Sequence, residues 1–116
     1  MKSALPSLLL IVVLGAVGFA QEAPKKITRS EALNAVSVKV QPDYPPVARQ
    51  LRMQGAVELQ VTIGETGEVT KVDIVSGNPV LTAPAAQAIK RWKFKPFVEN
   101  GKAISVVAPI AVDFKL

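Results

Sequence analysis

The sequence predicts an α+β fold, and three observations lead to that prediction. Apolar and polar residues alternate along residues 57–63 and again along residues 104–116, with the period of a half-buried strand. A turn at residues 64–67 contains two glycines and joins the first of these segments to another apolar run. Between the strands, residues 81–92 carry apolar side chains at helical spacing. A chain of 116 residues has the length of a single domain.

The first 20 residues have the layout of a secretory signal peptide. Lys2 precedes an apolar run over residues 8–19, and Gly18 and Ala20 are small residues at the −3 and −1 positions of a cleavage site. The alternative is a short membrane anchor, although the apolar stretch is shorter than the roughly 20 residues that span a bilayer. Either alternative predicts export and places the remaining chain outside the cytoplasm.

Residues 21–40 are predicted to be a linker that contains a short helix. The polar start, residues 21–26, includes a proline and is typical of a linker. Residues 28–36 allow a short helix with Ser30 as its N-cap. A turn over residues 41–46 follows, because a residue that precedes proline avoids the α region.

The domain is expected to occupy residues 41–116 and to begin with a short helix. Pro46 suits the first helical turn, where its missing N–H costs nothing. We expect this helix to cover residues 46–53, and Gly55 to end it. The helical spacing predicts that three apolar side chains face the core: Val47, Ala48 and Leu51.

The next three elements are a hairpin and a second helix. The strand over residues 57–63 pairs with a strand over residues 69–76, since so short a connection implies an antiparallel hairpin. Thr82 is the predicted N-cap of the helix, with Pro84 tolerated in its first turn. The apolar stripe of the helix contains Leu81, Ala85, Ala88, Ile89 and Trp92. Trp92 and Phe94 are expected to pack in the core.

The last strand has the clearest pattern in the chain. An Asn-Gly turn at residues 99–102 leads into alternating residues 104–116, a length about twice that of an ordinary strand, so we expect a bend or break within it. Pro109 cannot donate a ladder hydrogen bond, which places it on an edge strand with its nitrogen pointing outward. Alternate residues of a strand turn their backbone groups to the same side. Four residues are therefore expected to turn theirs to the open side with Pro109, away from the central strand over residues 57–63: Ser105, Val107, Ala111 and Asp113.

The composition excludes several function classes. The chain has no histidine or cysteine, so it lacks the commonest general base, a thiolate nucleophile and the strongest zinc ligands. We therefore expect no enzyme activity, no metal and no cofactor. The formal net charge of +5 is modest. Basic residues near the end of the second helix offset its dipole and do not indicate a nucleic-acid partner: Lys90, Arg91, Lys93 and Lys95.

The ordered motifs of residues 41–116 resemble those of the TonB C-terminal domain family. They comprise Tyr44-Pro45, Gly55, the hairpin around Gly67, the alanine-rich helix followed by Trp92, Phe94 and Pro96, and the final alternating strand. The resemblance implies two helices packed on a three-stranded antiparallel sheet. It also implies a periplasmic domain that binds the Ton box, the short N-terminal peptide of an outer-membrane transporter, during transport of siderophores or similar cargo.

The resemblance implies a site as well. The peptide adds to the last strand by β-augmentation, which here selects the edge of Ser105, Val107, Pro109, Ala111 and Asp113. A Gln-Pro pair just before Tyr-Pro contacts the partner in the family, and Gln41 and Pro42 occupy that place. Tyr44, Pro45, Gly55, Trp92, Phe94 and Pro96 are expected to be structural.

Three departures from the family limit what the resemblance implies. The chain has no histidine for coupling to an inner-membrane proton channel, residues 21–43 make a short spacer, and Thr82 stands where an acidic residue is expected. These departures do not support a proton-channel partner. They leave open a second function, in which the exposed edge pairs with a second copy or another envelope protein and no energy is transduced.

Overall fold

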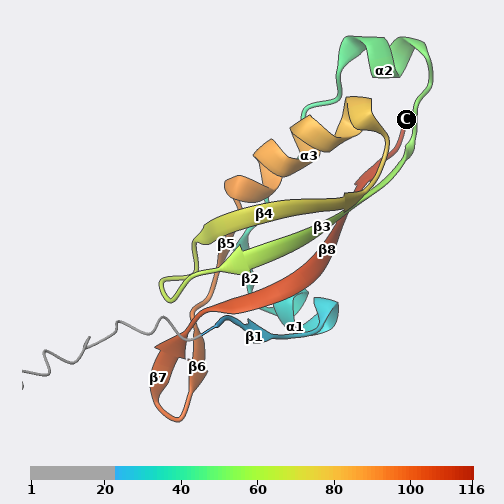
Figure 1. Cartoon of the computed structure of the whole chain (residues 1–116). Helices are drawn as coiled ribbons and strands as arrows, with labels where there is room; N and C mark the ends of the chain where they lie inside the picture. Colours follow the sequence, from blue (N-terminus) through green and yellow to red (C-terminus); the bar gives the residue numbers. More distant parts are fainter. Residues whose placement is uncertain (1–22) are drawn as a thin grey trace, which may run out of the picture.

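A computed structural model describes residues 23–116, and the predicted signal peptide or anchor, residues 1–20, lies outside this range. Figure 1 shows a twisted sheet with α3 along one face. In chain order, the elements are β1 (Lys25–Lys26), α1 (Arg29–Asn34), β2 (Val36–Val38), α2 (Pro46–Gln50), β3 (Gly55–Ile63), β4 (Val69–Ser76), α3 (Pro79–Lys90), β5 (Lys93–Phe94), β6 (Phe97–Glu99), β7 (Lys102–Ile104) and β8 (Val106–Phe114). Among these helices, none is long and apolar enough to cross a bilayer.

The main sheet confirms the predicted α+β class and the central position of β3. Its strand order is β1-β8-β3-β4, and β3 is antiparallel to both β4 and β8. These three strands form the antiparallel sheet that the family resemblance implies. The difference is a fourth strand: β1 pairs with β8 in parallel, in the register Lys25 to Val106.

The core lies on one face of this sheet. The even-numbered residues of β8 and the odd-numbered residues of β3 point into it, as their alternation predicts. α3 covers β3 and β4, while α1 packs against β8 (Figure 1). All five residues of the predicted α3 stripe are buried, as are several large side chains of the sheet: Leu59, Val61, Ile63, Val106 and Ile110.

α3 begins earlier than the sequence analysis predicts. Asn78, and not Thr82, is the N-cap, and its side-chain oxygen accepts a hydrogen bond from the Val80 N–H at 2.9 Å. Pro79 then occupies the first helical position, where a proline is favoured. Pro84 therefore lies inside the helix and not in its first turn. Proline at the true start of the helix and asparagine before it are the stronger signals.

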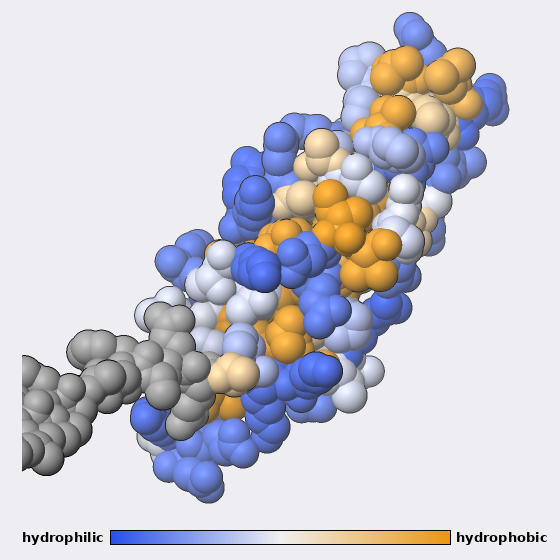
Figure 2. Space-filling model, in the orientation of Figure 1, coloured by the Kyte–Doolittle hydropathy of each residue, from blue (hydrophilic) through white to orange (hydrophobic). Residues whose placement is uncertain are grey.

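α2 is shorter than predicted and exposes most of its expected buried stripe. Only Ala48 is buried, whereas Val47 is 49% and Leu51 is 66% exposed. Figure 2 shows apolar surface at this end of the molecule. The helix ends in a Schellman motif, in which Met53 N–H donates to Ala48 O at 2.8 Å and Arg52 adopts a φ of 52°. With only five residues, α2 brings a single side chain, Ala48, into the core.

The segment predicted to be a linker packs onto the domain. Its short helix, α1, is present, but the N-cap is Thr28 and not Ser30, because Thr28 and Glu31 form a reciprocal capping box. Ala32 in this helix is completely buried. After α1, β2 pairs with β5, and Lys95 N–H donates to Ala35 O at 2.7 Å. Residues 25–38, called the N-terminal segment below, are therefore part of the fold.

The long C-terminal strand breaks, as its length predicts. Ser105 separates β7 from β8, and β7 pairs with β6 in a separate hairpin. Asn100 and Gly101 both have positive φ, at 52° and 75°, which is the backbone that the Asn-Gly turn predicts.

Candidate functional site

The candidate site is the side of β8 that faces away from β3, from Ser105 to Asp113, called the β8 edge below. The carbonyl oxygens of Ser105 and Val107 accept hydrogen bonds from Lys25 N–H at 3.0 Å and Ile27 N–H at 2.9 Å. Both oxygens therefore point away from β3. This is the parity that Pro109 predicts, since the odd-numbered residues of the strand turn their backbone groups outward.

The β8 edge is covered where the sequence analysis expected it to be open. β1 is hydrogen-bonded along Ser105 and Val107, and α1 packs against β8 beyond them. The Arg29 guanidinium also bonds the Glu58 carboxylate at 2.7 Å. Glu58 lies on β3, where its register partner on β8 is Ala111, so the Arg29 side chain reaches across β8 to β3. The expectation of an open edge is wrong at these positions, because the supposed linker occupies it.

The last part of the β8 edge differs from the first. Asp113 is exposed, and Ala111 is half-buried. Within residues 23–116, the outward N–H groups of Ala111 and Asp113 take part in no backbone hydrogen bond outside the β3–β8 pairing. The edge thus has one part that already carries a strand and one part whose backbone groups have no strand partner.

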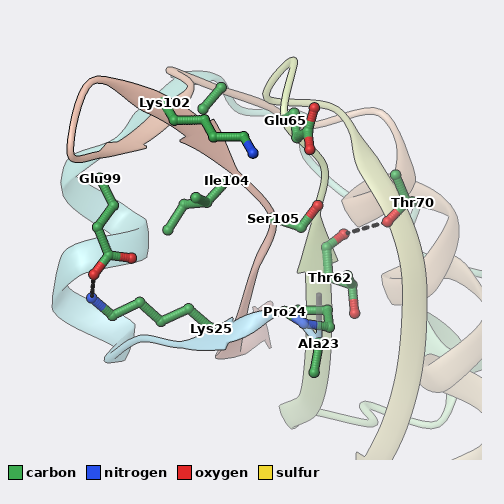
Figure 3. A pocket seen from close by; sticks show the side chains of 11 residues that line it. Ala23, Pro24, Lys25, Thr62, Glu65, Thr70, Glu99, Lys102, Ile104 and Ser105 are labelled. Atoms are coloured by element: carbon green, nitrogen blue, oxygen red, sulfur yellow. Dashed lines mark hydrogen bonds and ion pairs between the residues drawn. The ribbon is translucent and has the colours of Figure 1, made fainter. Parts of the chain in front are cut away.

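A pocket of about 580 Å³ opens where β1 meets the β8 edge (Figure 3). It lies between β1, the β6–β7 hairpin and the β3–β4 turn. Lys25 and Glu99 form an ion pair of 3.1 Å on one side, and Glu65 lies across from it. Lys102 points into the space between them. Charges of both signs beside a strand edge suit a peptide backbone better than an apolar small molecule.

The two predicted partner contacts lie on a different part of the molecule. Gln41 is exposed and Pro42 is half-buried, in the stretch that runs along α3. Trp92 Nε1 fixes the start of this stretch by donating to Val40 O at 2.9 Å, and Asp43 lines a second pocket together with α3 residues. The structure therefore separates Gln41 and Pro42 from the part of the β8 edge that β1 covers.

The six predicted structural residues differ in burial, since two lie in the core while Gly55 and Pro96 are exposed. Trp92 and Phe94 are buried, with ring centroids 6.3 Å apart. Tyr44 packs edge-on against Phe114 at 5.5 Å, and its hydroxyl donates to Met53 O, which ties the α2 turn to the end of β8. Pro45 is the N-cap of α2, Gly55 opens β3 with a φ of 141°, and Pro96 follows β5.

The residues that cover the edge are not predicted from the strand and helix periods, although the sequence contains one signal for them. Thr28 and Glu31 have the spacing of a capping box, and an apolar residue at the preceding position, Ile27, completes the pattern of a helix N-terminus. Ile27 packs against the core cluster. The two lysines of β1 give no strand signal, because lysine is depleted in strands.

Comparison with known proteins identifies the family. The model of the Gram-negative bacterial TonB protein C-terminal region matches residues 40–116. The chain belongs to the TonB C-terminal domain family. Protein TonB of Vibrio cholerae is 35% identical over 83 residues, covering 70% of this chain and 34% of that protein. Protein TonB of Xanthomonas campestris pv. campestris is 35% identical over 77 residues, covering 65% and 34%.

A solved structure of the same family confirms the fold. The TonB C-terminal domain of Pseudomonas aeruginosa, determined by solution NMR, superposes with a TM-score of 0.60 at 25% identity, covering 70% of this chain and 84% of that one. The chain spans about a third of the length of the curated TonB proteins named above. The TonB family match begins at residue 40, so β1, α1 and β2 precede it.

Proposed function

We propose that this chain is a periplasmic TonB-type module that binds the Ton-box peptide of an outer-membrane transporter. The peptide adds to the β8 edge as an extra strand, and its binding serves the transport of siderophores or similar cargo. The residues that carry the interaction are those of the β8 edge: Ser105, Val107, Pro109, Ala111 and Asp113. Gln41 and Pro42 form a second contact with this partner.

One observation carries the proposal: the β8 edge already holds an extended segment. β1 is joined to it by backbone hydrogen bonds of 3.0 and 2.9 Å, in which the side chains of Ser105 and Val107 take no part. An edge that accepts one strand through its main chain can accept another, which is the basis of β-augmentation. Membership of the TonB family makes a transporter peptide the natural ligand.

The module binds and does not catalyse in this proposal. The absence of histidine and cysteine from the sequence leaves few groups suited to acid–base or nucleophilic chemistry. Export by residues 1–20 would deliver it to the periplasm. A proton-channel partner is not included, because the sequence has no histidine to take the coupling role.

The alternative function, self-assembly through an open strand edge, has less support. Its premise is a free β8 edge, and β1 and α1 cover much of that edge. The opposite edge, β4, has two register shifts against β3, which makes regular pairing with another strand difficult. Peptide binding at β8 therefore remains the better-supported proposal.

A titration tests the proposed function. Synthetic Ton-box peptides are added to the isotope-labelled full chain, and amide chemical shifts are followed by NMR. We expect the largest shifts at Ser105, Val107, Ala111 and Asp113. The same peptide with its central residue replaced by proline is the control, since it cannot form a regular ladder. Shifts confined to α3 or β4 would contradict the proposal.

A further inference from the structure

β1 occupies the place that an added strand would take. It is the outermost strand on the β8 side of the main sheet, it runs parallel to β8, and it belongs to a segment that precedes the TonB family match. We propose that β1 is a built-in occupant of the β8 edge and that a partner peptide replaces it. The partner runs in the same direction and presents a basic residue, any residue and an apolar residue, in the places of Lys25, Lys26 and Ile27. This inference rests on the proposed function.

β1 is held mainly by backbone hydrogen bonds, whereas α1 is anchored by a completely buried side chain. Besides the ladder bond from Val107 N–H to Lys25 O that the parallel register implies, β1 is joined to the domain by the two backbone bonds to Ser105 and Val107 and by the Lys25–Glu99 ion pair, whose side chains are about half exposed. An ion pair so exposed contributes little to stability. α1 has a reciprocal capping box and the completely buried Ala32. β1 is thus the part of the N-terminal segment that a competitor can displace while α1 stays in place.

Pro109 explains why β1 is so short. In a parallel ladder, a residue that donates to one outward carbonyl also accepts from the outward N–H two residues further along the partner strand. Lys25, which donates to Ser105 O, therefore accepts from the N–H of position 107. The group that Ile27 O would accept from belongs to position 109, and proline has no N–H. The ladder therefore ends after Ile27, and the chain turns into α1 at Thr28. A replacing peptide meets the same end point, which limits its first contact to Ser105 and Val107.

The side chains of β1 indicate what the partner must carry. Residues two apart on a strand face the same side, so Lys25 and Ile27 share the core side, where Val106 is the register partner of Lys25. Ile27 packs against the core cluster, and Lys25 reaches Glu99. Lys26 lies on the other side and is exposed. The apolar position therefore supplies most of the affinity, and the basic position adds a small preference.

The experiment uses a peptide with the chain's own sequence, residues 23–28 (APKKIT), blocked at both ends. It is added to the labelled full chain carrying Ile27→Asn, which weakens the docking of β1, or carrying the matched control Lys26→Asn. We expect the peptide to bind Ile27→Asn at least ~10-fold more tightly than the control, because the control keeps its own edge occupied. The shifts are expected at Ser105 and Val107. A Ton-box peptide is expected to gain affinity in the same variant.

Two further variants keep the test decisive. Lys25→Pro removes the N–H that bonds Ser105 O and keeps Ile27, whereas Lys26→Pro removes an N–H that points away from β8; only the first is expected to raise peptide affinity. These replace the asparagine pair if circular dichroism shows that Ile27→Asn is unfolded. In the peptide, changing the first lysine to glutamate is expected to weaken binding by about threefold, and Glu99→Lys in the protein to restore it.

The outcomes separate this inference from the proposed function. Equal affinity of the APKKIT peptide for the variant and its control, or shifts away from Ser105 and Val107, would overturn the inference. If Ton-box peptides bind both variants equally, the proposed function stands and β1 is not their competitor. If the APKKIT peptide binds Ile27→Asn as expected and no Ton-box peptide binds, the inference stands and the proposed function fails.

Discussion

β4 and β8 are the two outer strands of the antiparallel sheet, and their outer sides are arranged in opposite ways. β8 pairs with β3 without any register shift, and its outer side carries β1 and α1. β4 has register shifts near both ends, which leave Thr70 and Val75 without a partner on β3. Lys71 and Asp73 place charges between these two bulges.

The contrast shows two solutions to the problem of an exposed strand edge. Bulges and charges make β4 a poor template for another strand, so it needs no cover. β8 is regular and presents evenly spaced backbone groups, so it is either covered or bound. The regular edge is therefore the one suited to binding a strand, and four predictions test this difference.

Gly67→Ala is expected to have the largest effect, and it acts on the β4 side. Gly67 has a φ of 87°, and an added Cβ would lie 1.9 Å from the Phe94 carbonyl oxygen. We expect the free energy of unfolding to fall by roughly 4 kcal/mol, measured by denaturant unfolding. Gly101→Ala is the control: its φ is 75° but nothing lies within 4 Å of an added Cβ, so a loss of about 1 kcal/mol is expected. Equal losses would contradict the close approach at Gly67.

Ala32→Glu is expected to have the next largest effect, and it acts on the cover of β8. Ala32 has no exposed surface, so a carboxylate there would be buried without a partner or would force α1 off the sheet. We expect a loss of about 3 kcal/mol in the free energy of unfolding and faster hydrogen exchange of the Ile27 amide. Leu33→Glu, at a neighbouring position that is 44% exposed, is expected to change stability by less than about 0.5 kcal/mol. Unchanged exchange at Ile27 in Ala32→Glu would show that β1 docks independently of α1.

Lys25→Glu tests the ion pair that joins β1 to the β6–β7 hairpin. The change places two carboxylates together and is expected to cost about 0.5 kcal/mol at low salt. Glu99→Lys in the same chain should recover the loss, and 1 M salt should remove the difference between the variants because it screens exposed charges. A loss that salt does not change would assign another role to Lys25.

The double variant Lys71→Val and Asp73→Val is expected to have the smallest effect. The two charges are 3.7 Å apart and well exposed, so their removal should change stability by less than about 0.5 kcal/mol. Analytical ultracentrifugation is expected to show no new self-association relative to the unmodified chain, because the two bulges remain. A concentration-dependent dimer would show that charge and not strand geometry protects β4.

The parts of the fold with a repeating pattern could be predicted from the sequence. β3, β4, β8 and α3 each have enough residues for the strand or helix period to identify the buried face. α2 has only five residues, so its spacing could not show that Val47 and Leu51 remain exposed. α1 and β1 are short as well, and the physical reason for their position is the regular edge of β8, which their own residues do not encode.

The site could be predicted in one respect. Pro109 identifies which backbone groups of β8 turn outward, because a residue without an N–H is tolerated only where its nitrogen faces away from the paired strand. Pro109 carries no information about what lies against those groups. Ile27 and Glu99 come from distant parts of the chain, and only the fold brings them to the β8 edge. The partner contact proposed for Gln41 and Pro42 rests on the family resemblance and not on their surroundings in the fold.

The parallel direction of β1 has a mechanical consequence. The chain enters β1 at Ala23 and Pro24, beside the β6–β7 hairpin, while Leu116 lies at the α2 end of the molecule (Figure 1). Tension applied at Ala23 along the strand axis would load the bonds to Ser105 and Val107 together, in shear, whereas tension across the sheet would break them one after the other. β1 should therefore resist a lengthwise pull much better than a sideways one, and the direction of a pull on the chain decides how readily the β8 edge is uncovered.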